Sequence, residues 1–552
     1  MSPRDIYRWT SLPTEDVEKY KPGGFHPVEI GDRIGPSDRY LITRKLGYGG
    51  FSTVWLAQDT LEKNFVSIKI LKASCSDNHD QIGLYKDLFN NSRSAGGKEA
   101  KLANADTPEW TQYILPMLSS FTQSGPNGDH SCMIFEPMGS TAGALMRYPP
   151  TGYPGIGIGL GTYFGKIVLR QMLGAIVSLH AQGIIHGDLH IDNVLLPLQL
   201  PPKNNREGIA PFFTPQQIDN ESARKVRRRD KKQLTENVPK HLMVPIPSFL
   251  HTLTVDNTFH PRVIDITGAT PKGGLSSKTP IYLQSPELVL DNIATENQDI
   301  WAFGFAIYEV LTGCRPISGI SVHCQHEHRI DEMMLSFNDF VGTLPLSLRA
   351  KWGRYSEYFD KNDRRNKRYP SDIHKILIED DIEGSNVYDE NGTDESETSE
   401  NNEDNDDDGA SERDIQDDNN EEEGDFQAFF EQDGGAENLE QCQSSNAEAE
   451  EKEPQNPRSD AAKERAKRPP PQSGLLEDLF DFARPPEMGS EETEQIKDLL
   501  RSIFQYDPQK RPRAVDLQKH PWFAESFSDD GGLSSLKLST TKKSANGSYL
   551  LN

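Results

Sequence analysis

The chain has 552 residues, enough for two or three domains or for one large domain with insertions. Its net charge is −26, yet the segment Glu379–Glu453 alone carries 31 acidic residues and two basic ones. The rest of the chain is therefore close to neutral, which excludes a uniformly acidic fold. No apolar run reaches the roughly 18–20 residues of a membrane helix. Five cysteines at scattered spacings and a plain polar start indicate an intracellular chain with reduced thiols.

The predicted elements begin after a polar extension at residues 1–37. The stretch Arg39–Leu71 alternates β-branched and polar residues around turn signals, which predicts three strands. Helical periodicity follows at Leu84–Ala105 and Tyr163–Gln182, and again in "QDIWAFGFAIYEVLTG". A last helical block runs from "EETEQIKDLL" to "KHPWF". A β-rich part thus precedes a larger helical part.

Two long segments interrupt this order. Residues 197–260 are Pro-rich with a basic centre, "ARKVRRRDKKQ", and residues 379–473 contain the acidic tract. Both have too little apolar area to offset the entropy of ordering, so both are predicted to be disordered insertions. An alternative is that the basic and the acidic segment pair with each other. The tail at 525–552 is expected to be loose.

The stretch "LGYGGFSTV" places glycines at the tip of a predicted β-hairpin. Backbone N–H groups at such a turn can approach the phosphates of ATP closely. Ser52 stands at the third glycine position, and a glycine-rich hairpin can also be a bare turn. The residues predicted to contact the nucleotide here are Leu46, Gly47, Gly49 and Val54.

Further nucleotide contacts are predicted in the next strands. Lys69, fifteen residues after Val54, would hold the α- and β-phosphates and pair with Glu99 of the following helix. The strand "CMIFEPMG" predicts a hinge whose backbone pairs with adenine, with Glu136 and Met138 at the site. A solvated lysine and an ordinary buried strand are the alternatives.

The stretch "IIHGDLHIDNVLL" places Asp188 five residues before Asn193, and Asp265 follows in "VIDITGA". Asp188 would orient the substrate hydroxyl and accept its proton, while Asn193 and Asp265 would bind Mg²⁺. Single Asp and Asn residues in loops are usually turn formers. Their order after a glycine-rich hairpin and a strand lysine nevertheless predicts phosphoryl transfer, with ATP and Mg²⁺ as cofactors.

The catalytic-loop pattern also occurs in small-molecule kinases, so the C-terminal half decides the class. "TPIYLQSPE" resembles the peptide-positioning loop of protein kinases, and "QDIWAFG" resembles the helix whose Asp299 ties down the catalytic loop. "DPQKRP" supplies Arg511, expected to form a buried ion pair with Glu287. The implied α+β fold is the bilobal eukaryotic protein kinase fold, with a small β-rich N-lobe at 38–139 and a larger helical C-lobe at 140–524.

A narrower resemblance lies in "YKPGGFHPVEIGDRI" and the strands after it, which are similar to the opening of the SR-protein-specific kinases. The long spacer after the catalytic loop and the stretch Met333–Phe359, which resembles an extra helical insert, fit the same family. This resemblance covers roughly residues 20–196, 261–370 and 474–524. It implies a Ser/Thr protein kinase acting on Arg/Ser-rich proteins in cytoplasm and nucleus, monomeric, without direct nucleic-acid or membrane binding.

Three residues depart from the family pattern. Gly187 and His190 stand where protein kinases carry other residues, and Thr267 stands in a glycine position. His190 replaces a lysine that would place a fixed charge near the transferred phosphoryl group. A scaffold with weak or no phosphotransfer therefore remains an alternative to an active kinase.

Overall fold

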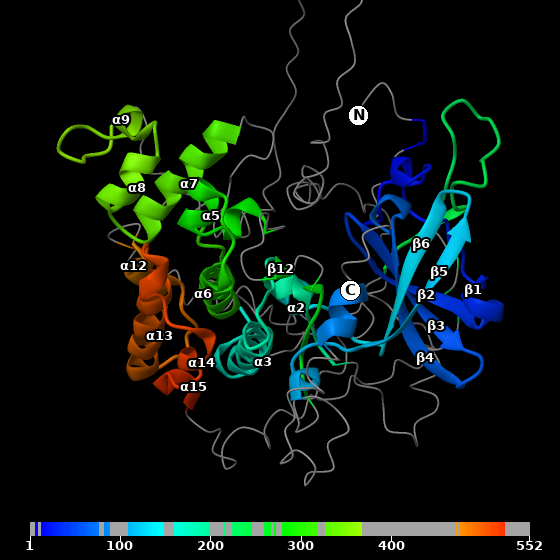
Figure 1. The fold of residues 1–552 in the computed structure, drawn as a ribbon, viewed down its shortest axis with the longest axis horizontal. Helices are drawn as coiled ribbons and strands as arrows, with labels where there is room; N and C mark the ends of the chain where they lie inside the picture. The colour runs from blue at the N-terminus through cyan, green and yellow to red at the C-terminus, as the bar shows by residue number, and fades with distance from the viewer. Residues whose placement is uncertain are drawn as a thin grey trace, which may run out of the picture.

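The computed structural model describes residues 6–8, 13–76, 82–88, 109–147, 159–197, 215–216, 218, 222–245, 259–266, 270–271, 279–317, 326–366, 467–468, 471 and 475–524. These residues form two lobes, a β-sheet lobe and a helical lobe, which lie side by side in Figure 1. The predicted bilobal α+β fold is therefore confirmed. In the described part of the chain, every helix is too short or too polar to cross a membrane.

The N-lobe is a six-stranded antiparallel sheet with the strand order β1-β2-β3-β4-β6-β5. The three strands predicted within Arg39–Leu71 are present as β2, β3 and β4. The three strands are buried along most of their length, and Ile42, Trp55 and Ile68 are almost fully buried in one core. The bounds are β1 (Arg33–Ile34), β2 (Tyr40–Tyr48), β3 (Ser52–Asp59), β4 (Asn64–Leu71), β5 (Met117–Gly125) and β6 (Gly128–Phe135).

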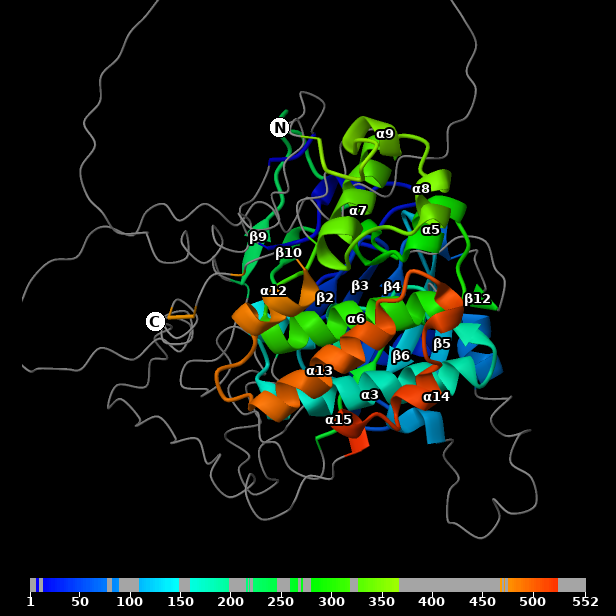
Figure 2. The same cartoon turned by 90° about the vertical axis from the view of Figure 1, so that its left-hand side faces the viewer.

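The C-lobe is built around α6 (Glu296–Thr312), which is buried on nearly all sides. Thr295 caps its start by accepting a hydrogen bond from the Asn297 N–H, and Gly313 ends it in the left-handed conformation at φ 73°. Helix α3 (Thr162–His180) and helix α13 (Ser490–Ile503) pack against α6, and the three lie side by side in Figure 2. The predicted helices at Tyr163–Gln182 and over "QDIWAFGFAIYEVLTG" are confirmed.

Shorter helices surround this centre. Trp301 of α6 contacts the rings of Phe337 and Phe504 edge-on, at 5.3 and 5.0 Å between centroids, which joins α7 and the end of α13 to the core. The bounds are α2 (Ala142–Arg147), α5 (Pro286–Asp291), α7 (His326–Phe340), α8 (Leu346–Lys351), α9 (Tyr355–Tyr358), α12 (Leu476–Ala483), α14 (Ala514–Leu517) and α15 (Pro521–Ala524).

One part of the predicted disordered spacer is ordered. Within 197–260, residues 222–245 form the antiparallel strands β9 (Ala223–Lys225) and β10 (His241–Met243). Val226 and Leu242 of this hairpin pack with Tyr7 and Phe25 of the N-terminal extension in a separate small core. The prediction was wrong here because the hairpin obtains its apolar partners from a distant part of the chain, which its basic composition does not reveal.

Some predictions lie outside the described residues. Residues 82–88 are helical, as predicted for Leu84–Ala105, but the rest of that helix is not described. The same holds for the acidic insertion at 379–473, except at residues 467–468 and 471, and for the tail at 525–552. Any pairing between the acidic and the basic segment likewise lies outside the described residues.

Candidate active site

The glycine-rich turn joins β2 to β3. Gly47 pairs with Val54 across the two strands, and the Gly49 N–H donates to the Ser52 carbonyl at 2.8 Å. A Cβ atom added at Gly47 would meet nothing within 4 Å, and Leu46 and Val54 are half-buried beside it. The turn therefore leaves room for a phosphate next to the backbone. That these four residues contact a nucleotide remains a prediction.

Lys69 lies in the middle of β4, between Val54 on β3 and Met133 on β6. Its Nζ atom is 3.0 Å from Asp265 Oδ1, so the lysine forms an ion pair across the two lobes. Asp265 has φ 61°, a left-handed conformation that is uncommon for a residue other than glycine. Such backbone strain concentrates at functional sites. Glu99, the partner predicted for Lys69, lies outside the described residues.

The predicted hinge follows β6. Ser67 Oγ donates to the carbonyls of Phe135 and Glu136, at 3.4 and 3.2 Å, which holds the start of this segment against β4. Met138 is buried, and Glu136 is exposed. The Gly139 N–H donates to the Leu196 carbonyl at 2.9 Å, so the segment connects the two lobes. The adenine contact predicted for Glu136 and Met138 remains a prediction.

The catalytic loop lies between β7 (Ile184–Ile185) and β8 (Val194–Leu195) and is held by Asp299 of α6. The Asp299 carboxylate accepts hydrogen bonds from the backbone N–H groups of His186 and Gly187, at 2.8 and 2.9 Å. Its Oδ2 atom also lies 2.8 Å from His180 Nε2. Asp299 thus contacts the loop as predicted. Gly187 has φ 74°, so the glycine in this position suits a left-handed backbone.

Asp188 and Asn193 contact each other within the catalytic loop. Asn193 Nδ2 donates to the Asp188 carbonyl at 2.8 Å and lies 3.4 Å from its Oδ2 atom. Asp188 Oδ1 accepts no hydrogen bond from the described residues, although it is buried. Burial raises the pKa of the Asp188 carboxyl; His190 lowers it, and the negative charge of Asp265 raises it. A buried carboxylate oxygen that accepts no hydrogen bond from the described residues can accept one from a further group.

His190 occupies the lysine position of the loop. Its Nδ1 atom accepts a hydrogen bond from the Asp192 N–H at 3.2 Å, and its Nε2 atom lies 3.5 Å from Asp188 Oδ1. The ring therefore stiffens the loop next to the predicted catalytic residue.

Burial alone would raise the pKa of Asp192, but the hydrogen bond and charge of Arg147 bring it below the ordinary value. Thr267, the third departure, lies outside the described residues.

The predicted ion pair between Arg511 and Glu287 is present. The guanidinium donates to both carboxylate oxygens, at 2.6 and 2.8 Å, and the Arg511 side chain is fully buried. It also donates to the Gln505 and Asn297 carbonyls and lies 4.7 Å from the centre of the Trp301 ring. The pair thus anchors the end of the peptide-positioning loop to the core of the C-lobe.

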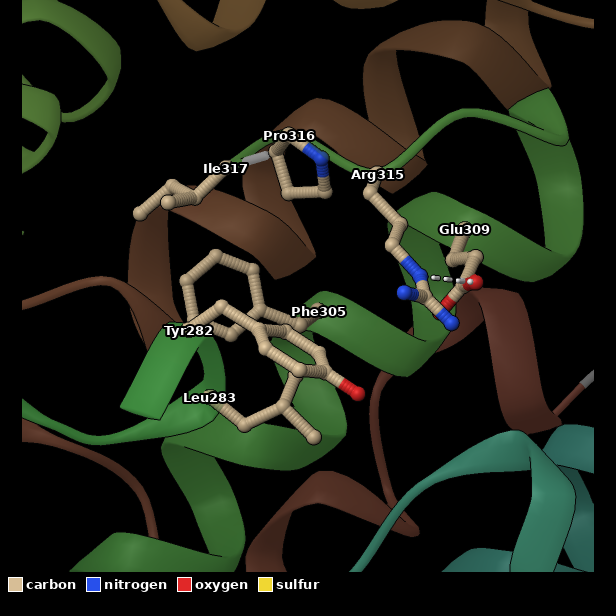
Figure 3. A pocket seen from close by; sticks show the side chains of 7 residues that line it. All are labelled: Tyr282, Leu283, Phe305, Glu309, Arg315, Pro316 and Ile317. Atoms are coloured by element: carbon tan, nitrogen blue, oxygen red, sulfur yellow. Dashed lines mark hydrogen bonds and ion pairs between the residues drawn. The ribbon is translucent and has the colours of Figure 1, made fainter. Parts of the chain in front are cut away.

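The peptide-positioning loop at 279–287 contacts both the catalytic loop and α6. Thr279 Oγ1 donates to the Gly187 carbonyl, and the Ser285 N–H donates to Gln298 Oε1 at 2.8 Å. Figure 3 shows the small pocket behind this loop, where Tyr282 faces Arg315 and Arg315 pairs with Glu309 at 3.1 Å. Burial is the main cause that raises the pKa of Tyr282 to about 12. These contacts fix the loop beside Asp188.

Sequence reasoning missed several of these supporting residues. His180, Gln298 and Thr279 hold the two loops but belong to no spacing pattern that we used. Gln298 stands directly before Asp299 and Thr279 opens "TPIYLQSPE", so their positions inside recognised stretches were the available signal. His180 ends a helix and offered none.

Comparison with known proteins gives several relatives. "Protein kinase dsk1" of Schizosaccharomyces pombe is 33% identical over 217 residues, 39% of this chain and 36% of that protein. "Serine/threonine-protein kinase SRPK" of Physarum polycephalum is 29% identical over 369 residues, which cover 63% of this chain and 76% of that protein. "SRSF protein kinase 3" of Homo sapiens is 34% identical over 186 residues, which cover 33% of this chain and 29% of that protein. Most of these matches thus span well under half of the relative's length.

These matches confirm the resemblance to the SR-protein-specific kinases. No family model matches the chain. The crystal structure of a kinase domain aligns with 90% of this chain and 98% of its own, at 16% identity and a TM-score of 0.45. A likeness this loose adds nothing to the fold described above.

Proposed function

We propose that this chain is an ATP- and Mg²⁺-dependent serine/threonine protein kinase of the SR-protein-specific type, which phosphorylates serines in Arg/Ser-rich proteins. The observation that carries the proposal is the meeting of Lys69 and Asp265, 3.0 Å apart, beside a catalytic loop that presents Asp188 and Asn193. These four residues come from both lobes, and they have the residue types that phosphoryl transfer requires. The similarity to the Physarum SRPK kinase and to SRSF protein kinase 3 supports the same reading.

The residues present fit a magnesium ion and a nucleotide. Asn193 uses Nδ2 for Asp188, which leaves its carbonyl oxygen as a ligand, and Asp265 supplies a carboxylate. Hard oxygen donors of this kind suit Mg²⁺. Asn193 and Asp265 would hold the ion, which when bound neutralises charge on the β- and γ-phosphates. Lys69 would hold the α- and β-phosphates under the open backbone of Gly47.

Asp188 would orient the serine hydroxyl of the substrate and accept its proton. The raised pKa of its carboxyl, caused first by burial, makes it a better proton acceptor than a solvated aspartate. Asp299 would act only through the backbone, because its hydrogen bonds to His186 and Gly187 keep Asp188 in place. The Arg511–Glu287 pair would hold the loop on which the peptide lies.

The substrate class, the location and the assembly rest on resemblance. We place the protein in the cytoplasm and nucleus, as a monomer that binds its protein substrate without nucleic acid or membrane. The support for Arg/Ser-rich substrates is the likeness to SRSF protein kinase 3 and to the Physarum SRPK kinase.

A peptide panel tests the substrate class. The purified full chain is incubated with radiolabelled ATP, Mg²⁺ and three peptides of equal length: an Arg-Ser repeat, a Lys-Ser repeat and a Glu-Ser repeat. We expect the Arg-Ser peptide to receive label at least tenfold faster than either of the others. Equal labelling of all three peptides would contradict the substrate class, and labelling of choline or an aminoglycoside instead would contradict a protein kinase.

A further inference from the structure

A buried ion pair joins the N-terminal extension to the strand that leads into the glycine-rich turn. Lys45 Nζ of β2 binds Glu15 Oε2, and the two side chains are 0% and 2% exposed. The Tyr20 hydroxyl donates to the other Glu15 oxygen at 2.5 Å. A buried ion pair of this kind is costly to break, because one charge is then left unpaired in the interior. What the pair does depends on which parts of the N-lobe it contacts.

Lys45 lies directly behind the glycine-rich turn. It is opposite Trp55 on β3, and the register between β2 and β3 shifts between Lys45 and Gly47. The ammonium group is 5.2 Å from the centre of the Trp55 ring and 5.4 Å from that of Tyr48, the last residue of β2. Glu15 thus fixes a cation that contacts both strands at the end where the turn begins.

A second segment outside the sheet holds the same part of β2. The Gln216 N–H donates to the Thr43 carbonyl at 2.8 Å, and Gln216 Oε1 accepts from the Lys45 N–H at 3.2 Å. Gln216 Nε2 in turn donates to the Val244 carbonyl next to β10 at 3.1 Å. Residues 43–45 are therefore held at their backbone by the ordered part of the insertion and at the Lys45 side chain by the extension.

We propose that Glu15 is a positioning residue for the nucleotide, which acts through Lys45 to hold the end of β2 and thereby the glycine-rich turn over the phosphates. This inference rests on the proposed function, because it requires the turn at Gly47 and Gly49 to bind ATP. Glu15 itself does not touch the nucleotide. Its effect is confined to nucleotide affinity, since the peptide-positioning loop belongs to the other lobe.

The test measures binding of a fluorescent ATP analogue, trinitrophenyl-ATP with Mg²⁺, to the full chain and to Glu15→Gln. The glutamine keeps the size of the side chain and removes the charge that holds Lys45. We expect the dissociation constant to rise about tenfold, while the KM for an Arg-Ser peptide stays within twofold. In the double variant Glu15→Gln/Lys45→Met, which leaves no buried charge unpaired, the dissociation constant stays raised by about tenfold, because the cation that contacts both strands is absent.

The matched control is an ion pair at the opposite end of the same two strands. Arg39 Nε lies 2.8 Å from Asp59 Oδ1, and Asp59 is paired in register with Tyr40 at the start of β2. Asp59→Asn should lower the melting temperature of the lobe without changing nucleotide affinity more than twofold. A merely structural role for Glu15 predicts that both variants lose affinity in proportion to their loss of stability.

All variants are compared at a temperature at which their circular dichroism matches that of the wild type. If Glu15→Gln does not fold, Glu15→Asp replaces it, because the shorter side chain keeps the charge but withdraws it from Lys45. Wild-type affinity in the Glu15 variants, equal losses in the Asp59 control, or recovery of wild-type affinity in the double variant would each overturn the inference. A wild-type chain that fails to bind the analogue would instead overturn the proposed function, and this inference with it.

Discussion

Lys69 and Asp265 form an ion pair that joins the central strands of the N-lobe to the loop after β11 (Arg262–Val263) in the C-lobe, with 3.0 Å between Nζ and Oδ1. The two side chains are 16% and 28% exposed, so the pair is partly open to solvent and does not lie in a core. An ion pair that is partly open to solvent contributes less to stability than a fully buried pair. The pair lies close enough to Asp188 for the charge of Asp265 to raise the pKa of the Asp188 carboxyl, which fits the role proposed for Lys69.

Replacing Lys69 should therefore separate activity from stability. We expect Lys69→Met to lower kcat/KM for phosphotransfer by about 10²-fold or more, because a preorganised positive charge next to the phosphates is lost. The melting temperature should change little. The control is Lys63→Met, an exposed lysine on the turn between β3 and β4, which should leave both quantities unchanged. A Lys69→Met chain of wild-type activity would contradict the role given to this residue.

Replacing Arg511, unlike replacing Lys69, should cause a large loss of stability. The Arg511 side chain is fully buried in a bidentate pair with Glu287, and Arg511→Met leaves that carboxylate without its partner. We expect a loss of about 3–5 kcal/mol in the free energy of unfolding, measured by denaturant titration.

The control for Arg511 is Arg513→Met. Arg513 pairs with Asp516 on the surface, one turn apart, and its loss should leave the denaturation midpoint unchanged. Equal midpoints for the wild type and Arg511→Met would show that the buried pair is dispensable.

His26 should make stability fall in weak acid. Burial, followed by the charge of the neighbouring His130, lowers the pKa of His26 to about 4, and the two rings lie 4.7 Å apart. Since the unfolded-state pKa is about 6.5, the unfolded chain binds the proton first as the pH falls. The stabilising contribution is fully present above pH 6.5 and is lost between pH 6.5 and 4, by about 3 kcal/mol in total.

Denaturant titrations at intervals between pH 7 and pH 4 check this dependence. The difference in unfolding free energy between the wild type and His26→Asn should shrink as the pH falls over that range. A difference that stays constant with pH would show that His26 is not buried in its neutral form.

His190 should limit kcat for phosphotransfer. Its Nδ1 atom accepts from the Asp192 N–H, so the ring is held in the loop without the fixed positive charge that a lysine would supply. We expect His190→Lys to raise kcat about tenfold, because a permanent cation would then face the transferred phosphoryl group. His190→Gln, which lacks that charge, should not raise kcat. Equal kcat values for the lysine variant and the wild type would show that this position does not limit turnover.

Much of the fold could be predicted because local signals and long-range contacts agree. Strands β2, β3 and β4 are rich in β-branched and aromatic residues and place them in one core, and α6 starts at a threonine cap and ends at a glycine. The Arg511–Glu287 pair and the Asp299 contacts could be expected from their recognised stretches. The structure reports where Lys69, Asp188, Asn193 and Asp265 lie, and their roles in catalysis remain to be tested.

The rest depends on contacts that have no local signal. Glu15 and Lys45 meet because the extension folds back under β2, and neither residue belongs to a periodic pattern. The β9–β10 hairpin has few apolar residues, so its composition predicted disorder, yet Val226 and Leu242 are buried against the extension. In both cases a distant segment supplies the partner, and tertiary packing overrides the local preference.

The central claim is that Asp188 serves phosphoryl transfer to protein serines, and one comparison tests it most directly. Wild type and Asp188→Asn are assayed for transfer of radiolabelled phosphate from ATP to an Arg-Ser repeat peptide, with the melting temperature of each measured in parallel. We expect the wild type to label the peptide and Asp188→Asn to lose at least 10²-fold of the rate at an unchanged melting temperature. Equal labelling by both proteins, or no labelling by the wild type, would contradict the account.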